Sequence, residues 1–553
     1  MGVACSGQTG CVHIVLERRG GSVALIDDDG RETLVLDHDL PGAIVEREPE
    51  HPRWVWSDTA QWYPPVLARG VRIERCHDLR LVDAILAGID GVAPRRSWGL
   101  VPSPPRPDTL FDLEHDDETD ARSTIDVLRA WERQRAAIAA HAEPARLTVL
   151  AAAESAGALA AVEMQHAGLP WSAAAHDELL TDLLGPRPGV GRRPARLDEL
   201  ATEVERLLDV GAVPIDSPPA LVGALRRAGL EVATTRSAEL KRLSHPAIAP
   251  LLEYKTLSRL HTANGWNWLD EWVHDGRFRP SFVPGGVVTG RWASDGGGAL
   301  QLPKQVRGAV RADDGWALMV ADASQLEPRI LAALSGDEAM ARAGAGEDLY
   351  AGIVASGAVA SREHAKVGML GAMYGGTTGV SAQVLPRLAR SFPRAIGFVE
   401  SAARAGERGE RVSTRLGRTS PTPSAGWFES QAAAASEGAA EAAVRAARSA
   451  ARSWGRFTRN FVVQGTAAEW ALAWMAGVRR RLWKADGAAL TVQPHLVFFV
   501  HDELIVHAPL DRVTEVEQAL HDAAGDAGRV VFGETPVTFP VSVASVRRYS
   551  DAK

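Results

Sequence analysis

Two strongly apolar segments near the C-terminus, Leu496–Val500 and Leu504–His507, are separated only by His501-Asp502-Glu503. Two β-like runs this close together predict an antiparallel hairpin. Tight hairpins favour Asn-Gly or Asp-Gly at the tip, so three ionisable residues there are unusual. A solvated turn is one explanation, and a functional site at the end of a buried sheet is the other.

A second apolar strand, Ala317–Ala321, ends in Asp322 and leads through a polar turn into a helix. Taken alone, an aspartate at a strand end is commonly a turn former or a helix cap. Together with the hairpin, we interpret Asp322 and Asp502 as two carboxylates that bind divalent metal. Mg²⁺ prefers oxygen ligands and substrate phosphates. Two such ions about 4 Å apart suit an in-line phosphoryl transfer.

A third element carries Arg362, Lys366, Leu370 and Tyr374 at four-residue spacing. On a helix these side chains form one slowly drifting stripe, which would suit a triphosphate, a sugar and a base. A solvated basic face is the usual explanation of such a stripe. However, only six of the 61 Lys and Arg residues are lysines. Lys366 therefore stands out, because an ammonium can donate a proton and a guanidinium practically cannot.

The length of 553 residues suggests about three to five domains. Hydrophobic residues make up 46% and charged residues 24%, as in ordinary globular proteins. No run of about 18 uncharged apolar residues and no secretory signal are found, so we expect no membrane association. The three cysteines, Cys5, Cys11 and Cys76, cannot form a disulfide framework, and we expect a reducing cytoplasm.

The chain changes character along its length. Three β-like runs open it, at Val12–Leu16, Val23–Ile26 and Thr33–Leu36. The Pro-rich stretch 101–107 and the acidic run 112–120 indicate a linker or exposed loop. Helical patterns follow from about Asp120 to His261, and again from about Gly336 to Met475. They include an alanine-rich helix at Gln431–Ala451, and Gly285–Gly298 is irregular and glycine-rich.

The formal net charge of −8 hides an asymmetry. Residues 1–120 hold 12 Lys and Arg against 22 Asp and Glu, whereas residues 401–484 hold 14 against 6. A basic segment beside an acidic domain is compatible with one nucleic-acid-binding face. A solvated charged surface explains the same numbers.

The three elements, in this order, resemble motifs A, B and C of the family A DNA polymerases, the DNA polymerase I type. The resemblance extends to further segments over about residue 125 to the end: Thr289-Gly290-Arg291 with Ser294, Leu300-Gln301 with Pro303, Ser217-Pro218 to Thr235 and Leu252 to Leu257, Thr414 to Arg418, and Arg456-x3-Asn460-x3-Gln464-Gly-Thr-Ala-Ala. Rich alanine and arginine usage indicates a GC-rich, bacterial genome.

The resemblance implies an α+β multidomain fold. A right-hand polymerase, with an antiparallel palm sheet and helical fingers and thumb, would follow an N-terminal α/β, RNase H-like domain of the 3′–5′ exonuclease type. The expected segments are 1–125 for the exonuclease-like domain, 126–262 for the thumb and connecting helices, 263–335 for the first part of the palm, 336–462 for the fingers and 463–553 for the second part of the palm.

The resemblance also implies roles for single residues. Asp322 and Asp502 would bind two Mg²⁺ ions, and Glu503 would assist near them. The nucleotide site would comprise Arg362, Lys366, Leu370, Tyr374, Glu327 and Gln325, with Lys366 as the acid for pyrophosphate and Glu327 excluding a ribose 2′-OH. The DNA contacts would come from Arg291, Gln301, Arg456, Asn460, Gln464, His501 and Gly375.

The sequence departs from the family pattern in three places. Leu370 replaces the aromatic residue that contacts the sugar, and Pro328 replaces an aliphatic residue. On the first strand, Val15 stands where an exonuclease has the Asp of Asp-x-Glu, and only Glu17 remains. No second carboxylate lies near Trp62, and Asp27-Asp28-Asp29 is typical of a turn. We therefore expect an exonuclease-like domain without proofreading activity.

The expected activity is template-directed addition of deoxynucleotides to a primer 3′-OH, in replication or repair. The expected partners are primer–template DNA and dNTPs, and we expect a monomer in the cytoplasm, associated with the nucleoid. Two alternatives are a single-subunit RNA polymerase and a non-catalytic DNA-binding relative. Gln325-Leu326-Glu327 and His501-Asp502-Glu503 favour the DNA enzyme over the first. The presence of Asp322, Asp502, Arg362 and Lys366 argues against the second.

Overall fold

The computed structural model describes residues 12–92, 126–189, 191–376, 378–483 and 488–552. The Pro-rich and acidic stretches, Cys5 and Cys11 lie outside these residues. The chain forms two compact units. Unit 1 comprises Met1–Ala167, Ser281–Ser294 and Met319–Ser545, and unit 2 comprises Gly168–Pro280, Asp295–Leu318 and Val546–Lys553. The five predicted segments stay a prediction, and each unit is described by itself.

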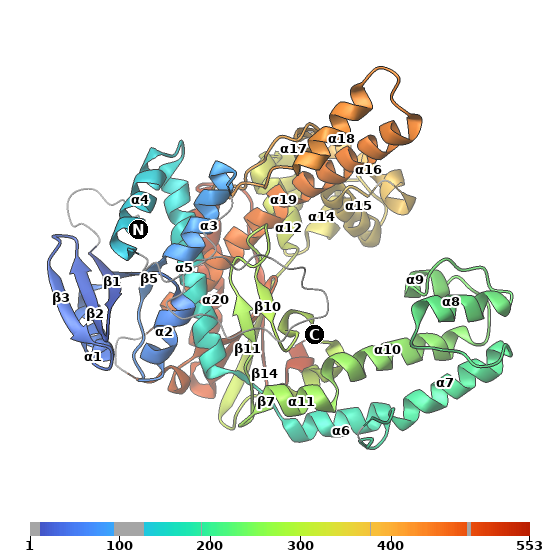
Figure 1. The fold of residues 1–553 in the computed structure, drawn as a ribbon, viewed down its shortest axis with the longest axis horizontal. Helices are drawn as coiled ribbons and strands as arrows, with labels where there is room; N and C mark the ends of the chain where they lie inside the picture. The colour runs from blue at the N-terminus through green and yellow to red at the C-terminus, as the bar shows by residue number, and fades with distance from the viewer. Residues whose placement is uncertain (1–11, 93–125, 190, 377, 484–487, 553) are drawn as a thin grey trace. The chain divides into compact units, whose positions relative to one another are not determined.

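Unit 1 begins with a five-stranded sheet of order β3-β2-β1-β4-β5 (Figure 1). Its strands are β1 His13–Arg19, β2 Ser22–Asp27, β3 Glu32–Leu36, β4 Arg53–Trp56 and β5 Arg75–Asp78. The first three strands pair antiparallel, and β4 and β5 continue in parallel. The helices of this region are α1 Leu40–Arg47, α2 Thr59–Leu67 and α3 Leu79–Asp90. The three predicted β-like runs are confirmed as β1, β2 and β3.

One face of this sheet is filled with apolar side chains. Val15 of β1 is 3% exposed and belongs to a buried cluster with Val55 of β4 and Trp131 of helix α4 (Val127–Ala140). The predicted turn after β2 is confirmed, because the Asp27 carboxylate accepts backbone N–H groups from Asp29 (3.0 Å) and Arg31 (2.8 Å). Glu17 lies 3.6 Å from Arg19.

Helix α5, Pro144–Ala167, is the core helix of unit 1. It packs against β5, α2, α19 (Glu441–Arg481) and β12 (His495–Val500). By length and composition alone it could cross a membrane, but 78% of its most apolar window is buried inside the protein, as in the core of a soluble protein. Glu154 and Glu163 interrupt its apolar sequence. The helix therefore contains no run of about 18 uncharged apolar residues, as the sequence analysis states.

The second sheet of unit 1 has the order β12-β13-β11-β14 (Figure 1). Its other strands are β11 Trp316–Ala323, β13 Glu503–Pro509 and β14 Val541–Val546. The predicted hairpin is confirmed as β12 and β13, which pair antiparallel with Val500 opposite Glu503. Glu503 is therefore a buried strand residue, and only His501 and Asp502 form the loop. A short pair, β9 Ser281–Val283 and β10 Ala293–Asp295, precedes this sheet.

Most of the remaining elements in the described part of unit 1 are helices. They are α12 Leu326–Ser335, α13 Glu338–Ala343, α14 Leu349–Ala355, α15 Arg362–Tyr374, α16 Gly379–Ser391, α17 Pro393–Glu407, α18 Ala425–Ala435, α19 and α20 Val513–Phe532. The expected single helix Gln431–Ala451 is wrong. It is broken between α18 and α19, where Gly438 adopts φ +80°, a left-handed conformation that favours glycine.

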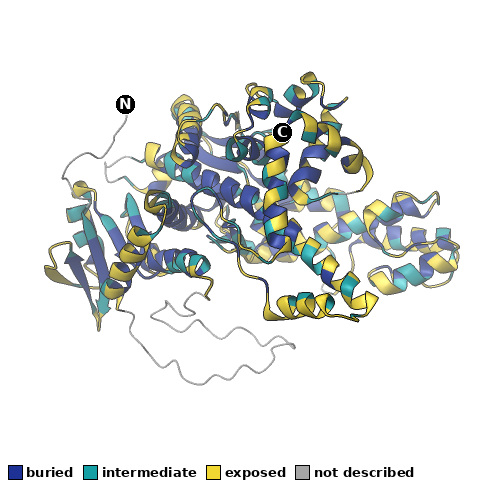
Figure 2. Ribbon diagram, turned by 90° about the horizontal axis from the view of Figure 1, so that it is seen from above, coloured by how far each residue is buried: buried dark blue, intermediate teal, exposed yellow. Residues whose placement is uncertain are grey.

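Unit 2 is mainly helical, with α6 Ala173–Leu184, α7 Ala195–Leu208, α8 Pro218–Arg227, α9 Ser237–Leu240, α10 Ile248–Asn264 and α11 Trp266–Trp272. A small sheet joins β6 Leu169–Pro170, β8 Arg277–Phe278 and β7 Val273–His274. Helix α6 ends directly before Gly185, and α8 starts at Pro218. Figure 2 shows long exposed stretches on the helices and buried strands in the sheets.

Candidate functional site

The two predicted metal-binding aspartates meet at one edge of the second sheet. Asp322 is the penultimate residue of β11, and Asp502 lies in the loop between β12 and β13. The backbone N–H of Ala323 donates to the carbonyl oxygen of Asp502 at 2.8 Å, which fixes the two segments side by side. Their carboxylates are hard oxygen donors and fit a hard divalent cation. No cluster of three or more His, Cys, Asp or Glu residues suited to metal occurs in the described parts of the chain.

Two residues beside these aspartates adopt a left-handed backbone. Gln325 and His501 each have φ 55°, which is uncommon outside glycine and concentrates at functional sites. The Gln325 turn is held by its own side chain, whose Oε1 accepts the N–H of Leu349 at 2.6 Å and whose Nε2 donates to Asp348 at 3.1 Å. Its side chain is thus engaged with the start of α14 in this structure, and a nucleotide contact stays a prediction.

Glu327 lies between two other predicted site residues. Arg291 forms an ion pair with its carboxylate, and the Tyr374 hydroxyl donates to Glu327 Oε2 at 2.8 Å. Burial and the adjacent Glu327 charge raise the pKa of Tyr374, and Asn460 also bonds its hydroxyl. Burial and the charge of Arg291 lower the pKa of His501. The structure therefore gathers these five predicted residues into one connected group.

Helix α15 presents the predicted stripe to solvent. Ser361 caps its first turn by accepting the N–H of His364 at 3.2 Å. Arg362, Lys366, Leu370 and Tyr374 are all exposed, the last two by 37% and 41%. The opposite face, which includes Ala365, Met369, Ala372 and Met373, is buried. The predicted stripe along one face of a helix is confirmed, whereas binding of a triphosphate to it stays a prediction.

Two residues of this region were missed by sequence reasoning. Asp348 caps α14 and binds Arg362 Nε at 2.7 Å, so it holds a predicted phosphate ligand. Arg329 is fully buried and donates to the carbonyl oxygens of Ser324, Gly344, Gly346, Glu347 and Thr538. An aspartate directly before an apolar helix is a capping signal that could have found Asp348. No local pattern marks Arg329, because four of its five partners are carbonyl groups 15 or more residues away in the chain.

Helix α19 carries Arg456, Asn460 and Gln464 four residues apart. Gln464 accepts a hydrogen bond from the Thr289 hydroxyl at 3.0 Å, which connects the two predicted motifs. Arg456 packs against Gly375, the residue that caps the C-terminal end of α15. Gly375 has φ +76°, and the Cβ of any other residue at this position would lie 2.7 Å from the Cγ of Arg456. Gly375 is thus required both for its conformation and for this close approach.

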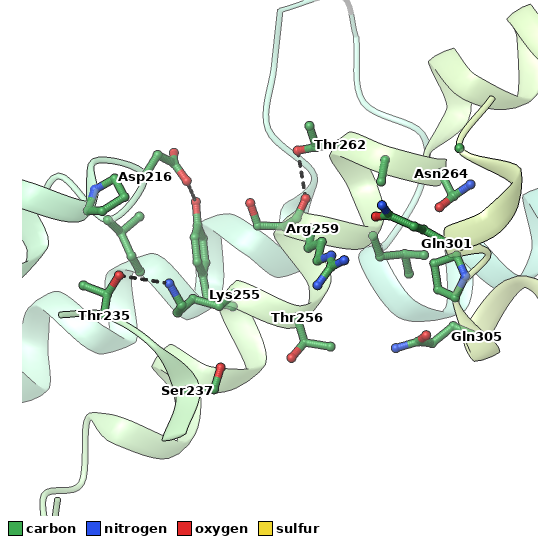
Figure 3. A pocket seen from close by; sticks show the side chains of 18 of the residues that line it. Asp216, Thr235, Ser237, Lys255, Thr256, Arg259, Thr262, Asn264, Gln301 and Gln305 are labelled. Carbon is green, nitrogen blue, oxygen red and sulfur yellow. Dashed lines mark hydrogen bonds between the residues drawn. The ribbon is translucent and has the colours of Figure 1, made fainter. Parts of the chain in front are cut away.

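Unit 2 contains a large groove with a cavity volume of about 850 Å³ (Figure 3). Lys255 and Arg259 of α10 line it, and Lys255 Nζ donates to the Thr235 hydroxyl at 3.3 Å. The predicted DNA contact Gln301 also lines this groove. Cations and amides on the wall of an open groove are typical of surfaces that bind a phosphate backbone.

Comparison with known proteins gives the family of the chain. The family model described as DNA polymerase family A matches residues 194–550. The chain belongs to DNA polymerase family A. Its curated relatives include DNA polymerase I, thermostable, of Thermus filiformis, 29% identical over 59% of this chain and 39% of that protein. DNA polymerase I of Chloroflexus aurantiacus is 27% identical over 59% and 35% of the two chains. The chain therefore spans less than half the length of these family A relatives.

The fold of this family A polymerase chain also matches a solved structure. That structure is described as the POL domain of Pol1 from M. smegmatis in complex with DNA primer-template and dNTP. The TM-score is 0.70 at 21% identity, over 98% of this chain and 95% of that chain. The match covers the N-terminal sheet as well as the family A region. It confirms the predicted fold class, a multidomain α+β polymerase fold.

Proposed function

We propose that the chain is a template-directed DNA polymerase, which adds deoxynucleotides to a primer 3′-OH and releases pyrophosphate. The observation that carries the proposal is the pairing of Asp322 and Asp502 at one sheet edge, in a chain whose α15 exposes Arg362 and Lys366. Family membership supports the reaction class. The DNA and dNTP bound by the M. smegmatis relative suggest the same classes of ligand here.

Divalent metal fits the donor set of this site, because two carboxylates supply hard oxygen ligands. Two Mg²⁺ ions held by Asp322 and Asp502 would supply charge neutralisation and activation of the attacking and leaving oxygens. The protein groups bind and orient the reactants. Arg362 and Lys366 hold the triphosphate, and Lys366 donates a proton to pyrophosphate. Positioning and neutralisation of charge are the main sources of rate in phosphoryl transfer.

Preference for deoxynucleotides would come from Glu327. The Arg291 ion pair and the Tyr374 hydrogen bond fix this carboxylate in one position. A carboxylate held on both sides cannot easily move away from a ribose 2′-OH. Leu370 would contact the sugar, and Tyr374 and Gly375 would flank the templating base.

DNA contacts are proposed for both units. In unit 1, Arg291 and His501 would face the primer end, and Arg456, Asn460 and Gln464 would contact the primer–template. In unit 2, the groove that contains Gln301 would bind the duplex. We further propose that this enzyme is a cytoplasmic monomer associated with the nucleoid and acting in replication or repair.

We also propose that the N-terminal sheet does not proofread. The face that would carry exonuclease carboxylates is occupied by Val15, Val55 and Trp131. The remaining acids are engaged elsewhere: Asp58 caps α2 and pairs with Arg80 at 3.2 Å, and the buried Asp78 caps α3. Hydrolysis by two metal ions needs several carboxylates at one point, and in the described residues of β1 this face carries only Glu17, which lies beside Arg19.

A primer-extension assay with Mg²⁺ tests the proposal. We expect dNTP-dependent extension of a matched primer, little incorporation of ribonucleotides and no shortening of a mispaired 3′ end. Extension with ribonucleotides at equal rates would favour the RNA polymerase alternative. Binding of primer–template without any extension would favour the non-catalytic alternative.

A further inference from the structure

The four-residue period of Arg456, Asn460 and Gln464 continues towards the start of α19. Arg452 and Arg448 precede them at the same spacing. Residues four apart on a helix are turned by about 40° and raised by about 6 Å, so the five side chains form one drifting stripe. The inner three already belong to the candidate site. The outer two have no role in it so far.

The outer part of the stripe faces solvent. Arg448, Arg452 and Arg456 are exposed, whereas Ala447 on the other side of the helix is 3% exposed. Helix α18 covers that other side, since Gln431 Nε2 donates to the carbonyl oxygen of Ala447 at 2.9 Å. Helix α17 covers the next turns, where the Thr458 hydroxyl donates to the carbonyl of Ala402 at 2.7 Å. The neighbouring helices thus leave the arginine face open.

These arginines have no carboxylate partner among the described residues. Arg445, one turn further out, pairs with Glu441 at 3.0 Å. In contrast, no Asp or Glu of the described residues lies within ion-pair distance of Arg448, Arg452 or Arg456. Guanidinium groups bind phosphate oxygens well, so a row of them on an exposed helix suits a strand that carries phosphates.

The small residues beside the row leave room for such a strand. Ser449 and Ser453 lie next to the arginines on the exposed side of the helix, and neither presents bulk or negative charge. At its inner end the row reaches Gly375 through Arg456. The outer end of the row lies near the tip that α18 and the start of α19 form. This tip projects beyond α16 in Figure 1.

We propose that Arg448 and Arg452 bind the backbone phosphates of the single-stranded template ahead of the templating base. This inference rests on the proposed function, because it requires a template strand at Arg456 and Gly375. The row from Arg448 to Arg456 spans about 12 Å along the helix axis, enough for consecutive phosphates of one strand. The contacts carry no base specificity, since they address only phosphate.

The test compares R448Q/R452Q with R129Q/R133Q, a matched pair of exposed arginines four residues apart on α4. Each protein is titrated with labelled primer–template that has a template overhang of either one or ten nucleotides. For R448Q/R452Q we expect about tenfold weaker binding of the long overhang and unchanged binding of the short one. The slope of log K against log salt should fall by about 1.4 for the long overhang, at about 0.7 per lost phosphate contact. R129Q/R133Q should match the parent on both.

The charge-retaining variant R448K/R452K should recover most of the binding, which separates loss of charge from a change in folding. Equal weakening on both overhangs, or no weakening, would overturn the inference. A loss seen only when a downstream duplex replaces the single strand would also overturn it. The proposed function has a separate readout: it fails if the parent extends no primer, whereas the overhang dependence is measured by binding alone.

Discussion

Strand β1 of the N-terminal sheet and strand β11 of the second sheet differ in what lies against them. On β1, Val15 is buried under Trp131, and Glu17 is left beside Arg19. On β11, Asp322 is only half buried, and the loop with Asp502 lies next to it. The same local pattern, a strand with acidic residues, therefore builds an apolar core in one place and an open site in the other.

The N-terminal region is also held to the rest of unit 1 by buried polar contacts. Glu163 of α5 pairs with Arg479 of α19 at 2.8 Å and accepts a hydrogen bond from the Tyr63 hydroxyl at 2.8 Å. Arg479 also donates to the carbonyl oxygens of Ile73 and Glu74. The helix that carries Asn460 and Gln464 is thus anchored, at its far end, to α5 and to the segment that precedes β5.

The largest effect is expected at the open site. Asp322→Asn or Asp502→Asn should lower the rate of extension by about 10³-fold or more, because several kcal/mol of transition-state stabilisation are lost with a metal ligand. Binding of primer–template should persist. Single-turnover extension and a binding titration check this, with Glu17→Gln on β1 as the control that retains full activity. Near-normal turnover in either variant would contradict the assignment.

Val15→Asp would break the comparison directly, since it restores the Asp-x-Glu pattern on β1. We expect no excision of a mispaired 3′ end and a loss of about 3–5 kcal/mol in stability, because an unpaired carboxylate is buried. Urea unfolding at pH 7 and pH 5 measures the loss of stability. The loss should be smaller at pH 5, because burial raises the pKa of a carboxyl group and favours its neutral form. Metal-dependent excision would show that the face is a latent active site.

Glu163→Gln tests the anchor between the two regions. Burial disfavours the Glu163 charge, but Arg479 and Arg72 outweigh it and lower its pKa to about 2. Because the pKa of Glu163 in the folded protein is below the ordinary 4.5, its carboxylate stabilises the fold. This contribution is fully present above pH 4.5 and is lost as the pH falls towards 2. The variant should therefore lose about 3 kcal/mol at pH 7, and the difference from the parent should shrink below pH 4.5. Glu132→Gln on the exposed side of α4 is the control, and a pH-independent difference would contradict the linkage.

Glu327→Ala sharpens the description of the open site. Removal of the carboxylate should improve ribonucleotide insertion relative to deoxynucleotides by about tenfold to hundredfold, the usual worth of a small steric change in a pocket. Tyr374→Phe removes the hydrogen bond to Glu327 but keeps the carboxylate, so it should retain most of the discrimination. Single-nucleotide insertion with both sugar types measures this. Unchanged discrimination in Glu327→Ala would place the sugar gate at another residue.

The smallest effect is expected at Leu370, which is 37% exposed on α15. An aromatic ring would bury a few tens of Å² more against a sugar, worth about 1 kcal/mol or about fivefold in KM. Leu370→Phe should lower the nucleotide KM accordingly, and Leu370→Tyr should ease insertion of dideoxynucleotides. Val380→Phe on α16, another exposed apolar position, serves as the control. If both Leu370 variants behave as the parent, then Leu370 does not face the sugar.

Local patterns were sufficient where burial and turns are set by neighbouring residues. The apolar runs at β1, β2, β11 and the β12–β13 hairpin all form strands, because alternation and apolar content act over a few residues. The alanine-rich helix Gln431–Ala451 failed because helix propensity alone does not fix a boundary. There the turn at Gly438 lets α18 fold back on α19.

The sequence by itself determined the family, the strands that carry Asp322 and Asp502, and the stripe of α15, since each depends on residue type and spacing alone. The tertiary structure decided which groups restrain that site. Asp348 binds Arg362, Arg291 and Tyr374 bind Glu327, and Arg329 binds four carbonyl oxygens that are distant in the chain. It also decided that α17 and α18 leave the arginine row of α19 open. Contacts between residues far apart in the chain depend on how whole elements pack, and no local pattern encodes that packing.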